Sequence, residues 1–191
     1  MRHNQNFNII MKNFSLILIF FIAYSLKAQV GIGTTPDSST MLDVQSTTSG
    51  FAMPRMSSSD RLNISNPVEG LQVYDTDYKV IWFFDGSEWR SVGPLAYGRI
   101  DPNGTPRRIF GATATRIEKG HYKITFNVPM PTEDYMISLS LRKEDNHERD
   151  DITIFWRYMS TTEFEVFIQD NDNGFDDGIP TDNMFLFSVS Y

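Results

Sequence analysis

Residues 170–178 form the densest group of potential metal ligands in this sequence, with Asp and Asn alternating around glycines that permit tight turns. The acids of this loop are Asp170, Asp172, Asp176 and Asp177. Calcium takes about six to eight oxygen ligands from flexible loops, so these acids are candidate calcium ligands. The spacing departs from an EF-hand, because Gly174 stands where an acid is expected and no Glu closes the loop. A solvated turn between two strands is the alternative interpretation.

A second candidate site is the run Trp156-Arg157-Tyr158, which follows a charged segment at 143–151. Tyr and Trp rings stack on the apolar faces of sugars, and a guanidinium donates a rigid fork of hydrogen bonds. The run can therefore bind a glycan or a protein partner. The alternation of residues 152–158 also fits a strand that buries Trp156 in the core and leaves Arg157 on the surface.

The groups that enzymes use for nucleophilic or thiolate chemistry are sparse. There is no Cys, which excludes disulfides and thiolate zinc sites. His121 is expected in a hairpin turn and His147 in a charged loop, so both are predicted to be solvated. No nucleophile elbow and no Gly-rich loop before a helix is present, and Asp150-Asp151 is interpreted as a loop or strand cap. We expect no catalytic residues and no enzymatic activity.

Residues 1–28 have the pattern of a signal peptide. Lys12 precedes an uninterrupted apolar run at 14–24, which is shorter than the ~18 residues that a membrane-spanning helix needs. We place the cleavage after Ala28, which makes Gln29 the new N-terminus. The protein is therefore expected to be secreted or at the cell surface. No later stretch is long and apolar enough to span a membrane.

The charge of the chain argues against one class of partner. The net charge is −7, and residues 1–28 carry three basic residues and no acid, so their removal leaves about −10. A chain this acidic is not expected to bind nucleic acid through its overall field.

The mature sequence divides near Gly93-Pro94 into a module at 29–94 and a domain at 95–191. The first module has short predicted strands at 41–44, 71–74 and 80–84. Ser57 and Asp60 predict a helical turn at 57–64, and Asp85-Gly86 predicts a hairpin. Much of the first half of this module is Ser, Thr and Gly, so it can bury little apolar surface by itself.

This module resembles a known family. Val30-Gly31-Ile32-Gly33-Thr34-Thr35-Pro36, Leu42-Asp43-Val44 and Pro54-Arg55-Met56 are similar to the opening of secreted and surface proteins of the Bacteroidota and of modules in phage tail-fibre proteins. Segments 66–77 and 84–89 extend the likeness. The resemblance implies a homotrimer with Leu42, Val44, Phe51 and Met53 near the threefold contact. The alternative is an extended linker whose hairpin packs on its own C-terminal domain.

From Leu95 onward every predicted element is a strand. Segments 115–119 and 122–128 flank a tight turn at Gly120-His121, and Tyr122, Ile124 and Phe126 share one face. Further strands are predicted at 135–141, 152–158, 163–168 and 184–191. Strands without a helical pattern predict an all-β fold with a C-terminal antiparallel β-sandwich, jelly-roll or knob-like.

The C-terminal domain also resembles a family, over roughly residues 96–191. Segments 126–135, 160–166 and 187–191 are similar to phage tail-fibre knobs and to small trimeric H-type-like lectins. This implies glycan binding, although the final strand lacks the tryptophan common there and the preceding loop is unusually acidic.

Together these patterns predict a secreted, non-catalytic recognition protein that binds a glycan or a cell-surface partner. The alternatives are a purely structural cell-surface or fibre component and, third, a hydrolase.

Overall fold

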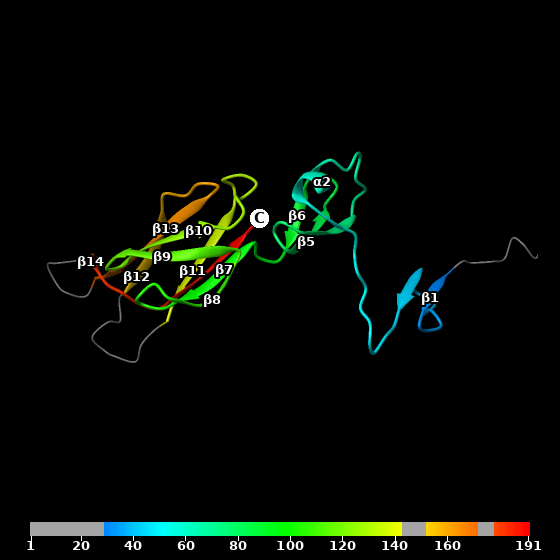
Figure 1. Cartoon of the computed structure of the whole chain (residues 1–191), viewed down its shortest axis with the longest axis horizontal. Helices are drawn as coiled ribbons and strands as arrows, with labels where there is room; N and C mark the ends of the chain where they lie inside the picture. Colours follow the sequence, from blue (N-terminus) through cyan, green and yellow to red (C-terminus); the bar gives the residue numbers. More distant parts are fainter. Residues whose placement is uncertain (1–28, 143–151, 172–177) are drawn as a thin grey trace, which may run out of the picture. The chain divides into compact units, whose positions relative to one another are not determined.

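The computed structural model describes residues 29–142, 152–171 and 178–191, which form strands and one short helix (Figure 1). The predicted signal peptide, His147, Asp150-Asp151 and the acids 172, 176 and 177 lie outside the described residues. The chain separates into two units, one ending at Ala52 and the other comprising Met53–Tyr191. No helix in the described part is long and apolar enough to cross a membrane.

The described part of the first unit, residues 29–52, contains two short parallel strands, β1 (Val30–Ile32) and β2 (Leu42–Val44). The glycines of its opening motif are required by close packing. A Cβ on Gly31 would lie 2.7 Å from the Pro36 side chain, and Gly33 has a φ of 78° with Gln45 O 2.2 Å from where a Cβ would stand. Only glycine fits at these two positions.

The second unit begins with a four-stranded sheet in the order β3-β4-β5-β6. Its elements are β3 (Arg55–Met56), α2 (Ser58–Leu62), β4 (Gln72–Asp75), β5 (Val80–Phe84) and β6 (Trp89–Val92). Ser57 caps α2 as predicted, because its hydroxyl accepts from the Asp60 N–H at 3.1 Å. The predicted hairpin is also confirmed: Asp85 Oδ1 accepts from the Ser87 and Glu88 amides, and Gly86 has a φ of 98°.

A buried ion pair holds this sheet to its helix. Arg61 Nε lies 3.0 Å from Asp75 Oδ2, and the two side chains are 3% and 0% exposed. The guanidinium lies 3.9 Å from the ring centroid of Trp82, and Trp89 is also near. Asp75 accepts further hydrogen bonds from Ser58 and from the backbone of the following turn, so the buried carboxylate is well satisfied.

The four-stranded sheet also packs on the C-terminal part of the same unit. The Tyr78 hydroxyl donates to Pro129 O at 2.6 Å, and burial together with the nearby Asp75 raises the pKa of Tyr78 to about 12. Trp82 lies beside Tyr191 with ring centroids 5.9 Å apart. The predicted boundary at Gly93-Pro94 thus falls between β6 and the sandwich, at a point where side chains from both sides are in contact.

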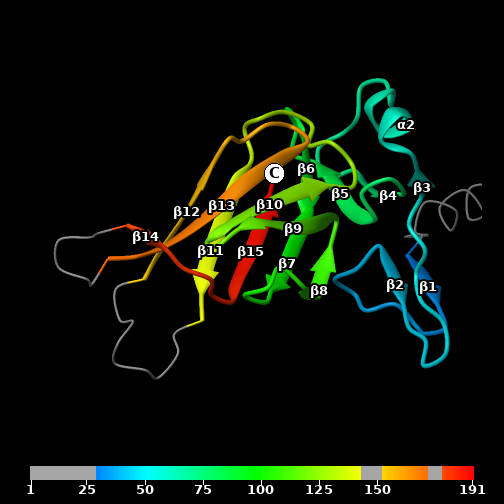
Figure 2. The same cartoon turned by 60° about the vertical axis from the view of Figure 1, so that its left-hand side comes forward.

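The sandwich consists of two antiparallel sheets (Figures 1 and 2). The first has the order β12-β13-β10-β9, with β14 (Ile179–Pro180) added to β13. Its strands are β9 (Ala112–Glu118), β10 (His121–Phe126), β12 (Thr153–Arg157) and β13 (Glu163–Asp170). The second has the order β11-β15-β7-β8. Its strands are β7 (Ala96–Ile100), β8 (Pro106–Phe110), β11 (Met136–Leu141) and β15 (Phe185–Ser190).

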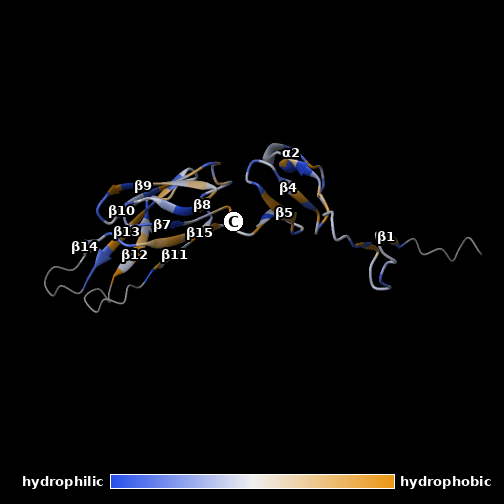
Figure 3. Ribbon diagram, turned by 60° about the horizontal axis from the view of Figure 1, so that its bottom comes forward, coloured by the Kyte–Doolittle hydropathy of each residue, from blue (hydrophilic) through white to orange (hydrophobic). Residues whose placement is uncertain are grey.

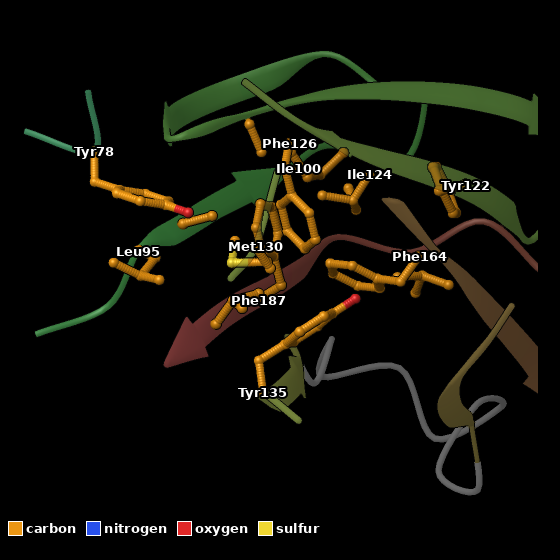
Figure 4. Close-up of a cluster of buried hydrophobic side chains, with 14 of the residues drawn as sticks. Tyr78, Leu95, Ile100, Tyr122, Ile124, Phe126, Met130, Tyr135, Phe164 and Phe187 are labelled. Atoms are coloured by element: carbon orange, nitrogen blue, oxygen red, sulfur yellow. The ribbon is translucent and has the colours of Figure 1, made fainter. Parts of the chain in front are cut away.

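The core of the sandwich is filled by alternate residues of both sheets. Tyr122 and Ile124 are fully buried, as their predicted shared face requires, and Phe126 packs edge-on against Tyr135. Figure 4 shows Phe164 and Phe187 in the same cluster, with ring centroids 5.9 Å apart. Figure 3 shows hydrophobic residues in strands of both sheets. The predicted all-β fold with a C-terminal antiparallel sandwich and a short-helix module is therefore confirmed.

Candidate ligand-binding surfaces

The predicted site Trp156-Arg157-Tyr158 lies at the end of β12, an edge strand. Successive residues of a strand point to opposite faces. Trp156 is paired with the buried Val166, whereas Arg157 is paired with Glu165 on the outer face. The structure therefore does not bring Trp156 and Arg157 together on one face. Trp156 is nevertheless 42% exposed, so it is not the core residue of the alternative interpretation.

Arg157 lies over an aromatic row that is formed by Phe155, Phe167 and His121. The three residues are direct cross-strand neighbours on β12, β13 and β10. The ring centroids of Phe155 and Phe167 are 5.6 Å apart, and those of Phe167 and His121 are 4.3 Å apart. The Arg157 guanidinium lies 4.9 Å from the Phe155 centroid and 5.6 Å from the Phe167 centroid. Among the described residues Arg157 forms no ion pair, so its donors face outward from an aromatic base.

The prediction of a solvated His121 in a hairpin turn is wrong. The turn is made by Lys119 and Gly120, and His121 is the first residue of β10. Gly120 has a φ of 69° and a Cβ there would lie 2.5 Å from Ile168 O, so only glycine fits this turn position. The His121 Nε2 atom lies 2.8 Å from Glu165 Oε2. The imidazole is thus a half-buried part of the aromatic row.

Tyr158 follows directly and is 68% exposed with a φ of 54°. A bulky side chain in this left-handed region costs about 1–3 kcal/mol, and such strain concentrates at functional positions. The next turn holds the conformation, since Ser160 N donates to Glu163 O and Tyr135 donates to Ser160 O at 2.7 Å. Tyr158 leans toward Phe167, with ring centroids 6.2 Å apart.

The outer face of the opposite sheet is hollowed into a groove of about 510 Å³. We call it the arginine–serine groove and define it by Tyr97, Arg99, Arg108, Ser138, Ser140 and Ser188. Cross-strand pairing orders these residues in two rows. One row runs Ser138–Ser188–Tyr97–Phe110 and the other Ser140–Leu186–Arg99–Arg108. Ser138 and Ser140 on the edge strand β11 and Ser188 on β15 form the part of the floor with short side chains, Leu186 on β15 interrupts it, and bulky side chains stand along β7 and β8.

Sequence analysis missed this groove because it predicted no strand between residues 96 and 110. The available signal was weak alternation, with Tyr97 and Arg99 on one strand and Arg108 and Phe110 on the next. Gly98 and Pro106 interrupt the pattern and indicate turns when the sequence is considered alone.

Of the predicted calcium ligands, only Asp170 lies within the described residues. It is buried at the end of β13, and its carbonyl accepts from the Gly178 amide at 3.1 Å. The described ranges contain no group of three or more His, Cys, Asp or Glu side chains placed to hold a metal ion. Asp172, Asp176 and Asp177 lie outside those ranges, so the calcium site stays a prediction.

The neighbouring Asp182 has a clear structural role. Its carboxylate accepts from Arg116 Nη2 at 2.7 Å, from the Gly120 amide at 2.9 Å and from the Tyr122 hydroxyl at 2.8 Å. Burial alone would raise the pKa of Asp182, but these hydrogen bonds outweigh it and lower the pKa to about 2. The carboxylate thus ties the segment before β15 to the β9–β10 hairpin.

Comparison with known proteins gives one family match. Residues 31–106 match a family described as a phage tail like trimerisation region. The match runs from β1 to the start of β8 and confirms the expected tail-fibre-like trimerisation module in this part of the chain. No curated protein and no solved structure matches.

Proposed function

We propose that this protein is a secreted or cell-surface homotrimer that recognises a glycan or a cell-surface partner without catalysis. Association is assigned to the trimerisation region, and recognition to the sandwich. The observation that carries the recognition role is the outward guanidinium of Arg157, supported on the aromatic row and next to the exposed, strained Tyr158. Rings and an arginine fork suit the apolar face and the hydroxyl groups of a sugar.

The association role is supported by the first unit. Val30 is paired with Leu42, and Ile32 with Val44, so four apolar side chains share one face of two very short strands. Their exposed fractions run from 40% for Val44 to 56% for Ile32. An isolated two-stranded sheet of this length is not stable in water, and contiguous apolar patches of this kind mark contact sites. We call these four residues the apolar face; two of them, Leu42 and Val44, are predicted threefold contacts.

Phe51, also predicted at the threefold contact, is 69% exposed, and Met53 is half-buried. A trimer that covers these side chains would present three copies of the sandwich. If the partner surface is itself repetitive, simultaneous engagement can raise the avidity by about 10²–10⁴ over a single site. Weak individual binding would then suffice for function.

The proposal is tested with the full chain on an array of glycans and on whole-cell surfaces. Wild-type protein should bind a defined subset of glycans or a surface protein, and Arg157→Gln with Tyr158→Ser should lower that binding at least about tenfold. Lys79→Gln is the control, because Lys79 is exposed in the turn between β4 and β5, outside the sheet that carries the aromatic row. Equal binding by both variants would reject Arg157 and Tyr158 as the binding surface.

A purely structural fibre component is the second candidate, and the trimerisation match favours it equally. The same experiment separates the two. A trimer that binds no glycan and no cell surface is the structural component.

A further inference from the structure

The arginine–serine groove contains an unfavourable pair of charges. Arg99 on β7 and Arg108 on β8 are direct cross-strand partners, and both point to the outer face. Like charges directly opposite each other on neighbouring strands destabilise a sheet. Neither arginine forms an ion pair with any described residue, although Arg99 Nε lies 3.2 Å from Met184 Sδ. In a chain with a net charge of −7, two adjacent unpaired arginines are a local exception.

A third arginine beside the groove shows the contrast. Arg107 also lines it, but Arg107 is paired with Asp101. Arg107 therefore has a carboxylate partner among the described residues, whereas Arg99 and Arg108 have none. An anion placed between these two guanidinium groups would relieve their repulsion and accept charge-assisted hydrogen bonds from both.

The rest of the groove suits a sugar ring. Phe110 stacks on one face of Tyr97, with centroids 5.4 Å apart and planes inclined by 20°. The cross-strand neighbour on the other side of Tyr97 is Ser188, which is too small to cover the ring. The second face of Tyr97 is therefore open toward the groove, where a sugar can stack on it.

The floor supplies hydroxyl groups. Ser138, Ser140 and Ser188 form no side-chain hydrogen bond with any residue in the described ranges. A serine hydroxyl can both donate and accept, as sugar hydroxyls require. Aromatic wall, hydroxyl floor and paired cations lie within one groove of about 510 Å³.

We propose that the arginine–serine groove binds an acidic oligosaccharide, with a carboxylate or sulfate between Arg99 and Arg108 and a sugar ring on Tyr97. This inference rests on the proposed recognition function and names its ligand class.

The test measures binding of the full chain to three soluble polymers at fixed ionic strength: a polyuronic acid, a sulfated polysaccharide and neutral dextran. We expect binding to one or both acidic polymers, weakened by added salt, and none to dextran. Arg99→Gln with Arg108→Gln should lower the affinity about 10- to 100-fold. The matched control, Lys79→Gln with Lys119→Gln, removes the same charge from exposed positions outside the groove and should change the affinity little.

A thermal readout separates binding from folding. Without ligand, Arg108→Gln should melt at the same temperature as the wild type or higher, since it removes a repulsion. The acidic polymer should raise the melting temperature of the wild type but not that of this variant. A variant that is destabilised without ligand would contradict the proposed repulsion.

The remaining outcomes distinguish this inference from the proposed function. Loss of acidic-glycan binding in Arg157→Gln but not in the groove variant, or binding to neutral glycans alone, would overturn the groove site and leave the recognition function standing. Equal competition by polyglutamate would replace the sugar with an acidic peptide. Dissociation of the trimer by the groove variant would make the groove a subunit contact. Absence of any glycan or surface binding would reject both proposals.

Discussion

Residues 29–52 expose their large apolar side chains to solvent, whereas residues 53–191 bury large apolar side chains in a core. In the first unit the apolar side chains Ile32, Leu42 and Phe51 are each more than half exposed. In the second, the large side chains Trp82, Phe164 and Phe185 are 1% exposed or less. The first segment thus leaves its apolar side chains exposed within a single chain, while the second closes a core within it. We therefore expect that association and folding can be changed separately by substitution.

The largest expected effect is on association. Leu42→Asp with Val44→Asp places two charges on the apolar face, where a trimer contact would bury them. An unpaired buried charge costs several kcal/mol, so the trimer should dissociate to monomers at micromolar concentration. Light scattering gives the mass, and circular dichroism should show that the sandwich remains folded.

The control for this change is Asp43→Asn, between the same two residues but on the other face of β2. It should leave the mass unchanged. A wild-type chain that is itself monomeric at this concentration would show that the apolar face is not a trimer contact.

The second prediction compares a core substitution in the second unit with a substitution of an exposed ring in the first. Phe164→Ala should destabilise the monomer by about 3–5 kcal/mol, because Phe164 is fully buried and its removal leaves a cavity. Phe51→Ala should cost little monomer stability, since Phe51 is 69% exposed, but should weaken association. Urea unfolding and sedimentation measure the two effects separately. Similar unfolding energies for the two variants would contradict the division.

The third prediction concerns the pH dependence of stability and applies to the second unit. Asp182 has a folded-state pKa of about 2, below its ordinary value of 3.8. Its interactions therefore contribute stability that is fully present above pH 3.8 and is lost as the pH falls toward about 2. The difference corresponds to about 2 kcal/mol. Asp182→Asn should remove this part of the acid dependence when unfolding energies at pH 5 and pH 2.5 are compared. If the acid dependence is unchanged, groups other than Asp182 are responsible for it.

How much the sequence predicted depended on the regularity of each segment. The run Tyr122, Ile124 and Phe126 alternates without interruption, so both its strand and its buried face were predictable. Ser57 predicted the start of α2 because a hydroxyl at that position satisfies a free backbone amide.

The failures arose where a tertiary contact overrides local pattern. Gly98 alone suggests a loop, yet it lies inside β7. Glycine is required there because a Cβ would stand 2.5 Å from the Phe187 ring. The shift of register between His121 and Tyr122 placed the histidine on the strand and not in the turn. Neither the aromatic row nor the arginine–serine groove could be predicted, since each joins side chains from strands that are distant in sequence.

The smallest expected effect is at Tyr158, a large side chain of the second unit that is 68% exposed. Its φ of 54° is a conformation that glycine adopts without strain. Tyr158→Gly should therefore stabilise the protein by up to about 1 kcal/mol, because it relieves the backbone and gives up little buried surface. The loss of the ring should at the same time lower binding at the Arg157 surface.

Trp156→Gly is the comparison for this change. It lies on the regular part of β12 and packs partly toward Val166, so glycine there should destabilise the sandwich. Urea unfolding should show that Tyr158→Gly raises the free energy of unfolding and that Trp156→Gly lowers it. If Tyr158→Gly is destabilising as well, the ring contributes to the fold through Phe167, and the strain at Tyr158 is not reserved for a ligand.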